Sequence, residues 1–322
     1  MKAIRVHQTG GPEAMQLDDV PTPEPGTGEA AIDVAAIGVN FIDVYFRAGL
    51  YKAPLPMTLG LEAAGTVRAV GAGVDAVAVG DRVAWTGVPG AYAETALVPA
   101  NRLVKLPAPL SFRDGAAAML QGMTAHYLAC STYPLQAGDT CLLHAAAGGV
   151  GLLLCQVAKR RGATVIATVS TDAKAELARG AGADHVILYA KEDFVAGVRR
   201  ATGGAGVHVV YDGVGATTFE QGLDCLRPRG MMVLFGAASG PVPPFDLGQL
   251  SAKGSLYVTR PTLFTYIMND AELHARAADV LGWIAAGQLK LRVEEDYPLA
   301  RAADAHRALE GRKTAGKVLL VP

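Results

Sequence analysis

The sequence is poor in the side chains that hold metals or cross-link a chain. It has four cysteines and seven histidines among 322 residues, and the cysteines form neither a CxxC pair nor a regular series. Residues 1–126 contain no cysteine and only two histidines, His7 and His126. Because zinc needs several converging Cys, His or carboxylate ligands, no metal centre is expected. We predict reduced core thiols at Cys130, Cys141, Cys155 and Cys225.

Long hydrophobic runs and an excess of charge of either sign are also missing. No stretch reaches the roughly 18 uninterrupted apolar residues of a membrane-spanning helix. The net charge is −1 and the isoelectric point is about 6.7, which argues against a protein that coats nucleic acid or a membrane surface. Residues 1–6 alternate like a first strand and lack the apolar core of a signal peptide. We therefore expect a cytoplasmic protein with no membrane insertion, for which a nucleic-acid partner is disfavoured.

The common hydrolase signatures G-x-S-x-G and H-E-x-x-H do not occur, so hydrolysis is not expected. Hydrophobic residues are abundant, at 51% of the chain against 18% charged residues. This composition is typical of a globular protein, and the length suits two domains, each with its own core.

The first third of the chain has the pattern of short strands separated by turns. Residues 29–38 and 64–70 alternate in polarity, and residues 80–84 lead from a turn into another strand. Proline and glycine cluster between these runs, which predicts an irregular, barrel-like β domain. Residues 111–128 then carry apolar side chains at helical spacing.

From residue 139 onward the pattern changes to alternating strands and helices. We predict strands over residues 140–145, 164–169, 186–188, 207–212 and 231–235, and helices over residues 149–161 and 171–180. Such alternation is typical of a parallel sheet with helices on both faces. Towards the C-terminus we predict a return to the first domain, with helices over 271–286 and 301–310 and strands over 291–294 and 317–321.

The strongest motif is Ala146-Ala147-Gly148-Gly149-Val150-Gly151, which lies between a predicted strand and a predicted helix. It is a variant of G-x-G-x-x-G with alanine at the first position. Small residues permit a tight turn in which backbone N–H groups approach a pyrophosphate, and the helix N-terminus favours its negative charge. The flanking strand and helix favour a dinucleotide site over a plain turn.

The end of the next strand indicates which dinucleotide binds. NAD sites usually place an acid there, roughly 20 residues after the glycines, to hold the ribose hydroxyls. The strand ends at Val169 and Ser170 without an acid, and we expect Asp172 to cap the following helix. Lys174, in the first turn of that helix, is unfavourable against the helix dipole unless an anion such as a 2′-phosphate lies nearby. The pattern favours NADPH over NADH, although Lys174 could also be a solvated surface lysine.

Several longer segments resemble a known family. They cover residues 38–45 (GVNFIDVY), 47–51 (RAGLY), 60–65 (GLEAAG), 144–151 (HAAAGGVG), 210–212 (VYD) and 253–261 (KGSLYVTRP). In this order they resemble the NADPH:quinone oxidoreductases, the zeta-crystallin-like branch of the medium-chain dehydrogenase/reductase superfamily. The resemblance extends over essentially the whole chain.

The resemblance implies an α/β protein of two domains. Residues 1–126, completed by 265–322, would form a GroES-like β-barrel catalytic domain. Residues 127–264 would form a Rossmann domain, a doubly wound parallel sheet that binds NADPH. Zinc-dependent relatives carry metal ligands where this chain has Asn40, Leu61 and a position near Gln121. The resemblance thus implies a zinc-free enzyme in which Glu62 is a structural carboxylate.

The resemblance also implies site residues. Asn40, Tyr45 and Tyr51 would be catalytic residues beside the nicotinamide, in a cleft between the domains. Residues implied to bind the cofactor are Thr124, the turn Ala147, Gly148, Gly149 and Val150, the 2′-phosphate pocket Ser170, Lys174 and Tyr189, the nicotinamide contacts Phe235 and Gly236, and Lys317.

Each of these residues also has a plainer interpretation. Tyr45 and Tyr51 could be packing residues, and Asn40 could cap a turn. Tyr189 could cover a strand end, and Lys317 could be a solvated charge beside the C-terminal strand.

The predicted activity is NADPH-dependent reduction of a small quinone or another electrophilic carbonyl acceptor, by one- or two-electron transfer. A quinone needs no dedicated general acid, because water can protonate its reduced oxygens. One alternative is an enoyl-thioester or alkenal double-bond reductase, in which a tyrosine would protonate the substrate. Another is a non-catalytic protein that binds NADPH or A/U-rich RNA.

A homodimer is also expected. Residues 254–260 have the pattern of a strand near the edge of the Rossmann sheet, and an unprotected edge can pair with a second copy. The family resemblance implies the same assembly.

Overall fold

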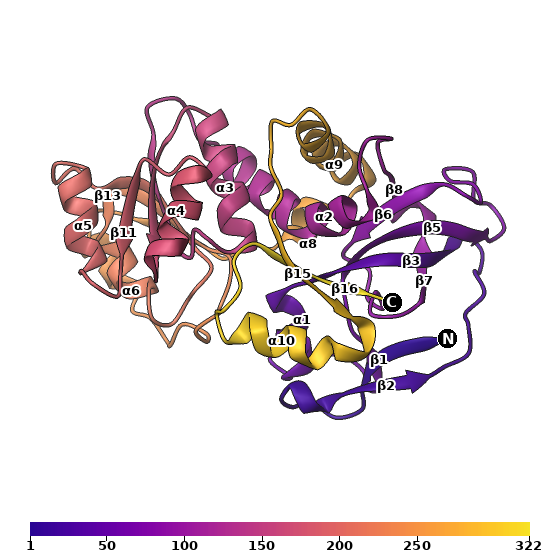
Figure 1. The fold of residues 1–322 in the computed structure, drawn as a ribbon. Coiled ribbons are helices and arrows are strands. Elements are labelled where there is room, and N and C mark those ends of the chain that lie inside the picture. Colours follow the sequence, from indigo (N-terminus) through magenta and orange to yellow (C-terminus); the bar gives the residue numbers. More distant parts are fainter. The chain divides into compact units, whose positions relative to one another are not determined.

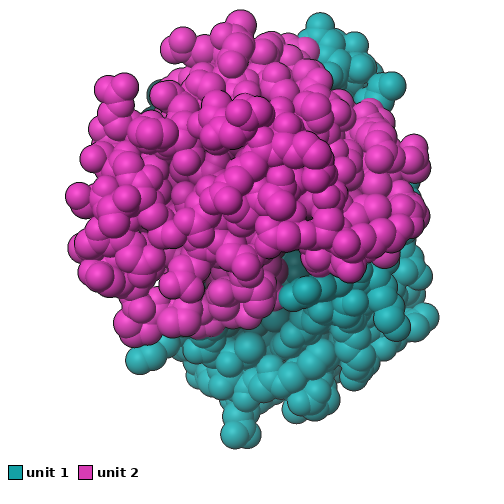
Figure 2. All heavy atoms as spheres, turned by 90° about the vertical axis from the view of Figure 1, so that its left-hand side faces the viewer, with its two compact units in different colours: residues 1–123, 266–322 teal, residues 124–265 magenta.

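The computed structural model describes all 322 residues, which form two compact units (Figures 1 and 2). Unit 1 comprises residues 1–123 and 266–322, and unit 2 comprises residues 124–265. The domain limits expected from the sequence were 1–126 with 265–322, and 127–264. Unit 1 is therefore built from both ends of the chain.

Two sheets form the frame of unit 1. Its strands are β1 (Lys2–Val6), β2 (Met15–Asp19), β3 (Glu29–Val39), β4 (Met57–Thr58), β5 (Glu62–Val70), β6 (Arg82–Thr86), β7 (Thr95–Pro99), β8 (Val104–Lys105), β15 (Val293–Pro298) and β16 (Lys317–Val321). The larger sheet has the order β15-β16-β3-β5-β6-β8, with β7 also paired to β3, and the smaller has the order β2-β1-β4. The C-terminal strand β16 pairs antiparallel with β3, so it completes the N-terminal sheet.

Four longer helices accompany these strands. They are α1 (Phe41–Arg47), α2 (Phe112–Tyr127), α9 (Asp270–Ala285) and α10 (Ala302–Glu310). Helix α10 packs beside α1 and β16 (Figure 1). Helix α2 begins in unit 1 and ends in unit 2, which starts at Thr124. No helix of the structure combines the length and apolarity that crossing a membrane requires.

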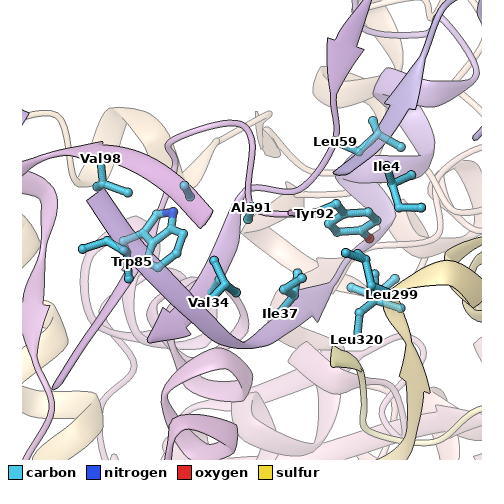
Figure 3. Close-up of a cluster of buried hydrophobic side chains, with 14 of the residues drawn as sticks. Ile4, Val34, Ile37, Leu59, Trp85, Ala91, Tyr92, Val98, Leu299 and Leu320 are labelled. Carbon is cyan, nitrogen blue, oxygen red and sulfur yellow. The ribbon is translucent and has the colours of Figure 1, made fainter. Parts of the chain in front are cut away.

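The core of unit 1 is packed around large side chains from several strands (Figure 3). Trp85 and Tyr92 are fully buried, and each aromatic side chain of this kind buries roughly 150–250 Å². Leu299 and Leu320 from the C-terminal segment join Ile4 from β1 in the same cluster. The two ends of the chain therefore share one core, which explains why neither forms a unit alone.

Unit 2 contains a six-stranded sheet. Its strands are β9 (Thr140–Leu143), β10 (Thr164–Val169), β11 (His185–Leu188), β12 (Val207–Asp212), β13 (Leu226–Leu234) and β14 (Tyr257–Thr259). All of them are parallel, in the order β11-β10-β9-β12-β13-β14. This is the Rossmann order, in which the chain reverses direction across the sheet after its third strand. The predicted fold class is confirmed.

Helices cover both faces of this sheet. Those that contact its strands are α3 (Gly149–Arg160), α4 (Asp172–Gly180), α5 (Phe194–Ala201) and α6 (Phe219–Leu223). The short helices α7 (Gly248–Ala252) and α8 (Leu263–Tyr266) come later in the chain, and α8 ends in unit 1. On one face, Leu142 and Val210 lie in a cluster with Phe194 and Phe219. Side chains alternate along a strand, so Cys141 faces the other side, near Cys155 of α3.

All four cysteines are free thiols, three of them buried and Cys130 half-buried. Burial raises the pKa of Cys141 well above its ordinary value and that of Cys155 to about 12. Both thiols are therefore unreactive core groups.

Two strands differ most from their predicted bounds. The strand expected over residues 231–235 is observed as β13 (Leu226–Leu234), and the other lies near the C-terminus. The strand expected over residues 291–294 is observed as β15 (Val293–Pro298), parallel to β16. Its acidic residues Glu294 and Glu295 are exposed, whereas Tyr297 is buried. Pairing with β16 sets these bounds, and local alternation does not reveal that pairing.

Candidate functional site

The predicted cofactor residues of unit 2 gather at one edge of its sheet. The turn 144–148 follows β9, Ser170 follows β10, Tyr189 follows β11 and Phe235 follows β13. Since the strands are parallel, all four segments lie at their carboxyl ends. In doubly wound sheets this edge binds ligands where the strand order reverses, which is here between β9 and β12.

The glycine motif leads directly into helix α3. Gly148 is the N-cap of α3 and has an extended backbone. A Cβ on Gly151 would overlap the carbonyl oxygen of Ala145, so this position requires glycine for α3 to approach the turn. The first N–H groups of the helix have no intrahelical acceptor and are available to an anion.

The segment after β10 corrects one prediction. Thr171, not Asp172, caps α4: its hydroxyl oxygen accepts from the Lys174 backbone N–H at 3.3 Å. Asp172 is the first helical residue and forms an ion pair with Lys191 at 2.8 Å, which holds the pKa of Asp172 below its usual value. The end of β10 thus has no acid that is free to bind the ribose hydroxyls of NAD. Tyr189 is 44% exposed and is tied to the end of β10 by its N–H bond to the Val169 carbonyl.

Asp212 organises the far side of this edge, and sequence reasoning gave it no role. Its buried carboxylate accepts hydrogen bonds from the N–H groups of Val214 and Gly215 and from the Thr218 hydroxyl. Its own carbonyl accepts from the Phe235 N–H at 2.8 Å. Asp212 therefore fixes both loops that follow β12 and β13. The available signal was an acid at the end of a buried apolar strand.

Unit 1 contains a buried polar group that we call the Asn40 cluster: Asn40, Glu62, Gln121 and Lys317. Glu62 Oε2 accepts from Lys317 Nζ at 2.5 Å and from Asn40 Nδ2 at 2.9 Å. Asn40 Oδ1 accepts from Lys317 Nζ at 2.9 Å and from Gln121 Nε2 at 3.1 Å. Side chains from β5, β16, α2 and the N-cap of α1 therefore meet at one point.

The cluster changes the interpretation of two predicted site residues. Lys317 is only 2% exposed, so the idea that it is a solvated charge is wrong. Its ammonium donates hydrogen bonds to Glu62 Oε2 and Asn40 Oδ1. The Asn40 carboxamide uses all four of its hydrogen-bonding positions within the protein, the fourth being a bond from Nδ2 to the Gly38 carbonyl. It has no free position with which to orient a substrate.

Asn40 also begins a second chain of buried hydrogen bonds. Its N–H donates to Asp43 Oδ2, which also accepts from the Tyr92 hydroxyl at 3.1 Å. The Tyr92 oxygen lies 3.0 Å from His306 Nε2, and His306 Nδ1 lies 3.1 Å from Arg47 Nη1. A guanidinium only donates, so Nδ1 accepts and the proton of neutral His306 is on Nε2.

Burial sets the charges along this chain. It lowers the pKa of His306 to about 3, with Arg47 adding to the effect, and raises the pKa of Asp43 to about 7. Arg47 is 2% exposed and forms a two-pronged ion pair with Glu310 at 2.8 and 2.9 Å. The chain therefore connects Asn40 to helix α10.

Tyr45 and Tyr51 lie together after Asn40. Their ring centroids are 5.4 Å apart in an edge-on arrangement, and the Tyr51 N–H donates to the Tyr45 carbonyl. Phe46 packs against Tyr51 at 5.6 Å. The structure thus shows a packing role for both tyrosines, and their contact with a substrate stays a prediction.

The resemblance implies that zinc-dependent relatives carry ligands at the positions of Asn40 and Leu61 and at a position near Gln121. In this structure the Asn40 and Gln121 side chains are hydrogen-bonded to each other, and Leu61 is buried. Among all 322 residues, no group of three or more His, Cys, Asp or Glu side chains is arranged to hold a metal ion.

Comparison with known proteins agrees with this architecture. Residues 26–108 match the alcohol dehydrogenase GroES-like domain, and residues 149–284 match the zinc-binding dehydrogenases. A quinone oxidoreductase of Pseudomonas aeruginosa is 48% identical over 100% of this chain and 99% of its own length. The chain belongs to the quinone oxidoreductase family.

Membership of this family, within the medium-chain dehydrogenase/reductase superfamily, makes the protein an oxidoreductase and confirms the predicted family and enzyme class. Escherichia coli quinone oxidoreductase crystallised with NADPH is similar over the full length of both chains, with a TM-score of 0.98 and 46% identity. A 2-haloacrylate reductase of a Burkholderia species is 44% identical over 99% of this chain and 98% of its own.

His306→Gln should change the response of stability to acid. The unfolded histidine takes up a proton near pH 6.5 and the folded one only near pH 3, so His306 destabilises the fold as the pH falls through this range. Its contribution is at most about 1.4 kcal/mol per pH unit. Asp43 acts oppositely, because its folded pKa of about 7 lies above its ordinary value of 3.8.

Urea unfolding of the wild type and His306→Gln at pH 6.5 and pH 4.5 measures the effect. The wild type should lose stability relative to the variant at the lower pH. An unchanged difference would show that His306 is not held neutral.

Proposed function

We propose that the protein reduces quinones with NADPH and without a catalytic zinc ion. The observation that carries the proposal is the gathering of the glycine turn, Ser170, Tyr189 and Phe235 at the carboxyl edge of a Rossmann sheet. The full-length similarity to quinone oxidoreductases, including one crystallised with NADPH, supports it.

The residues at this edge fit the cofactor. Because Gly151 lets α3 approach the turn, the N–H groups of Gly149 and Val150 can hold the pyrophosphate. Ser170, Lys174 and Tyr189 would hold the 2′-phosphate, next to a strand end whose nearest acid pairs with Lys191. When bound, NADPH supplies the hydride equivalent. Phe235 and Gly236, held through Asp212, would contact the nicotinamide, and Thr124 of α2 would contribute as well; Lys317 is not included.

On unit 1, Tyr45 and Tyr51 would contact the acceptor, and Asn40 would have a structural role. The residues in place of zinc ligands support a metal-free reaction. Leucine and amides are poor zinc ligands, and the Lys317 ammonium already lies 2.9 Å from Asn40 Oδ1, where it would repel a dication.

One second function has specific support. The similarity to a 2-haloacrylate reductase favours reduction of a carbon–carbon double bond beside a carbonyl. The same fold and cofactor would serve both reactions, so relative turnover decides between them.

The first test measures NADPH oxidation at 340 nm with a chelator present. We expect faster turnover of 1,4-benzoquinone and a naphthoquinone than of crotonyl and alkenal acceptors, with no loss on adding the chelator. Faster turnover of the alkenals would assign the double-bond reductase function instead. Loss of activity with the chelator would contradict the metal-free reaction.

Lys174→Gln should weaken the binding of NADPH but not that of NADH. Loss of one charge-assisted hydrogen bond to a phosphate costs about 1.5–3 kcal/mol, which corresponds to a Michaelis constant for NADPH roughly 10–100 times higher. Lys159→Gln, on α3 and paired with Asp184, is the control. An equal effect of Lys174→Gln on both cofactors would remove Lys174 from the 2′-phosphate site.

We also propose a homodimer formed through β14. This strand is at the edge of the sheet, and its Tyr257 and Val258 are 57% and 38% exposed. Light scattering at micromolar concentration should give twice the 33.3 kDa chain mass, and Val258→Lys should lower it. A wild-type monomer would contradict the proposal.

A further inference from the structure

The direction of every hydrogen bond in the Asn40 cluster is fixed by its ion pair. An ammonium only donates and a carboxylate only accepts. Lys317 donates to Asn40 Oδ1, while Glu62 and the Gly38 carbonyl accept from Asn40 Nδ2. The Asn40 amide therefore has one orientation, since a flipped amide would set oxygen against oxygen and nitrogen against ammonium.

This orientation determines how Gln121 lies. Because Asn40 Oδ1 can only accept, Gln121 must turn its Nε2 towards it, as the 3.1 Å bond shows. The second N–H and Oε1 of Gln121 then have no partner in the protein. The residue is 8% exposed, and buried amides normally satisfy their hydrogen-bonding capacity. Half of this amide is thus available to a ligand.

The position of Gln121 agrees with such a role. Gln121 and Thr124 are one turn apart on α2, so they share a face of the helix. Thr124 is a proposed cofactor contact. The partner of Gln121, Asn40, is the N-cap of α1, the helix that carries Tyr45.

We propose that Gln121 is the residue of the Asn40 cluster that binds the oxygen of the acceptor, and that Lys317 and Glu62 are positioning residues that fix its amide. The proposal rests on the quinone reduction proposed above. It moves the polar contact with the acceptor from Asn40, whose amide is fully used, to Gln121.

The free donor and acceptor of Gln121 suit both redox states of a quinone. The quinone carbonyl would accept from Nε2–H, and the hydroquinone hydroxyl would donate to Oε1. A hydrophobic side chain at this position offers neither bond. Gln121 would therefore favour acceptors with an accessible oxygen.

Gln121→Leu removes both groups with little change in size. We expect kcat/KM for 1,4-benzoquinone to fall about tenfold or more, as for the loss of one to two hydrogen bonds. The dissociation constant of NADPH should not change. Gln16→Leu makes the same substitution at an exposed position of β2 and should leave both quantities unchanged.

The positioning role is tested by a double-mutant cycle. Glu62→Gln/Lys317→Met removes both charges together and allows the Asn40 amide to flip. In the wild-type background it should lower kcat/KM several-fold, and in the Gln121→Leu background it should have no further effect. Equal effects in both backgrounds would show a merely structural role and overturn the positioning claim.

Binding of 1,4-hydroquinone to the NADP⁺-saturated protein, measured by calorimetry, tests Gln121 without turnover. Gln121→Leu should bind about tenfold more weakly than wild type. Equal binding by both proteins, or none by the wild type, would overturn the inference. The wild type could fail to turn over quinones and still bind hydroquinone in a way that depends on Gln121. That result would contradict the proposed function but not the role of Gln121.

Discussion

The buried ion pair between Lys317 and Glu62 is the interaction on which unit 1 depends most. Glu62 begins β5 and Lys317 begins β16, and both strands pair with β3, which Asn40 follows. Desolvating two charges costs several kcal/mol per ion and is offset only when the remaining hydrogen-bonding positions are filled. Here the Leu120 N–H donates a hydrogen bond to Glu62 Oε1 at 2.6 Å. The C-terminal strand β16, the N-terminal strand β5 and helix α2 are thus held together by one buried ion pair.

The same ion pair also sets the direction of the hydrogen bonds at the proposed acceptor site. It orients the Asn40 amide, which in turn orients Gln121 on α2. From Asn40 a second chain of directed hydrogen bonds passes through Asp43, Tyr92 and His306 to the Arg47–Glu310 ion pair, which joins α1 to α10. Unit 1 therefore combines an apolar core with one continuous polar network, and the network ends at the proposed acceptor residues.

The sequence predicted what local patterns determine. Parallel strands buried on both faces form apolar runs, so β9, β10 and β12 were predicted nearly at their observed bounds, and the glycine motif predicted the turn before α3. The sequence did not show which of Thr171 and Asp172 caps α4, because both residue types suit an N-cap. The alternative that Lys317 is a solvated charge was wrong because its burial depends on a partner 255 positions away, which no local pattern shows. Gln121 was considered only as a lost metal ligand, since its role depends on how Asn40 is oriented.

The account is tested most directly by the free energy of unfolding of Lys317→Met, Glu62→Gln and the double variant. If the pair holds the cluster, Lys317→Met leaves the Glu62 carboxylate buried without its counter-charge and should cost about 3–5 kcal/mol. The double variant, which removes both charges, should cost clearly less than the sum of the single variants. Additive costs, or a Lys317→Met variant as stable as the wild type, would contradict the central place of this ion pair.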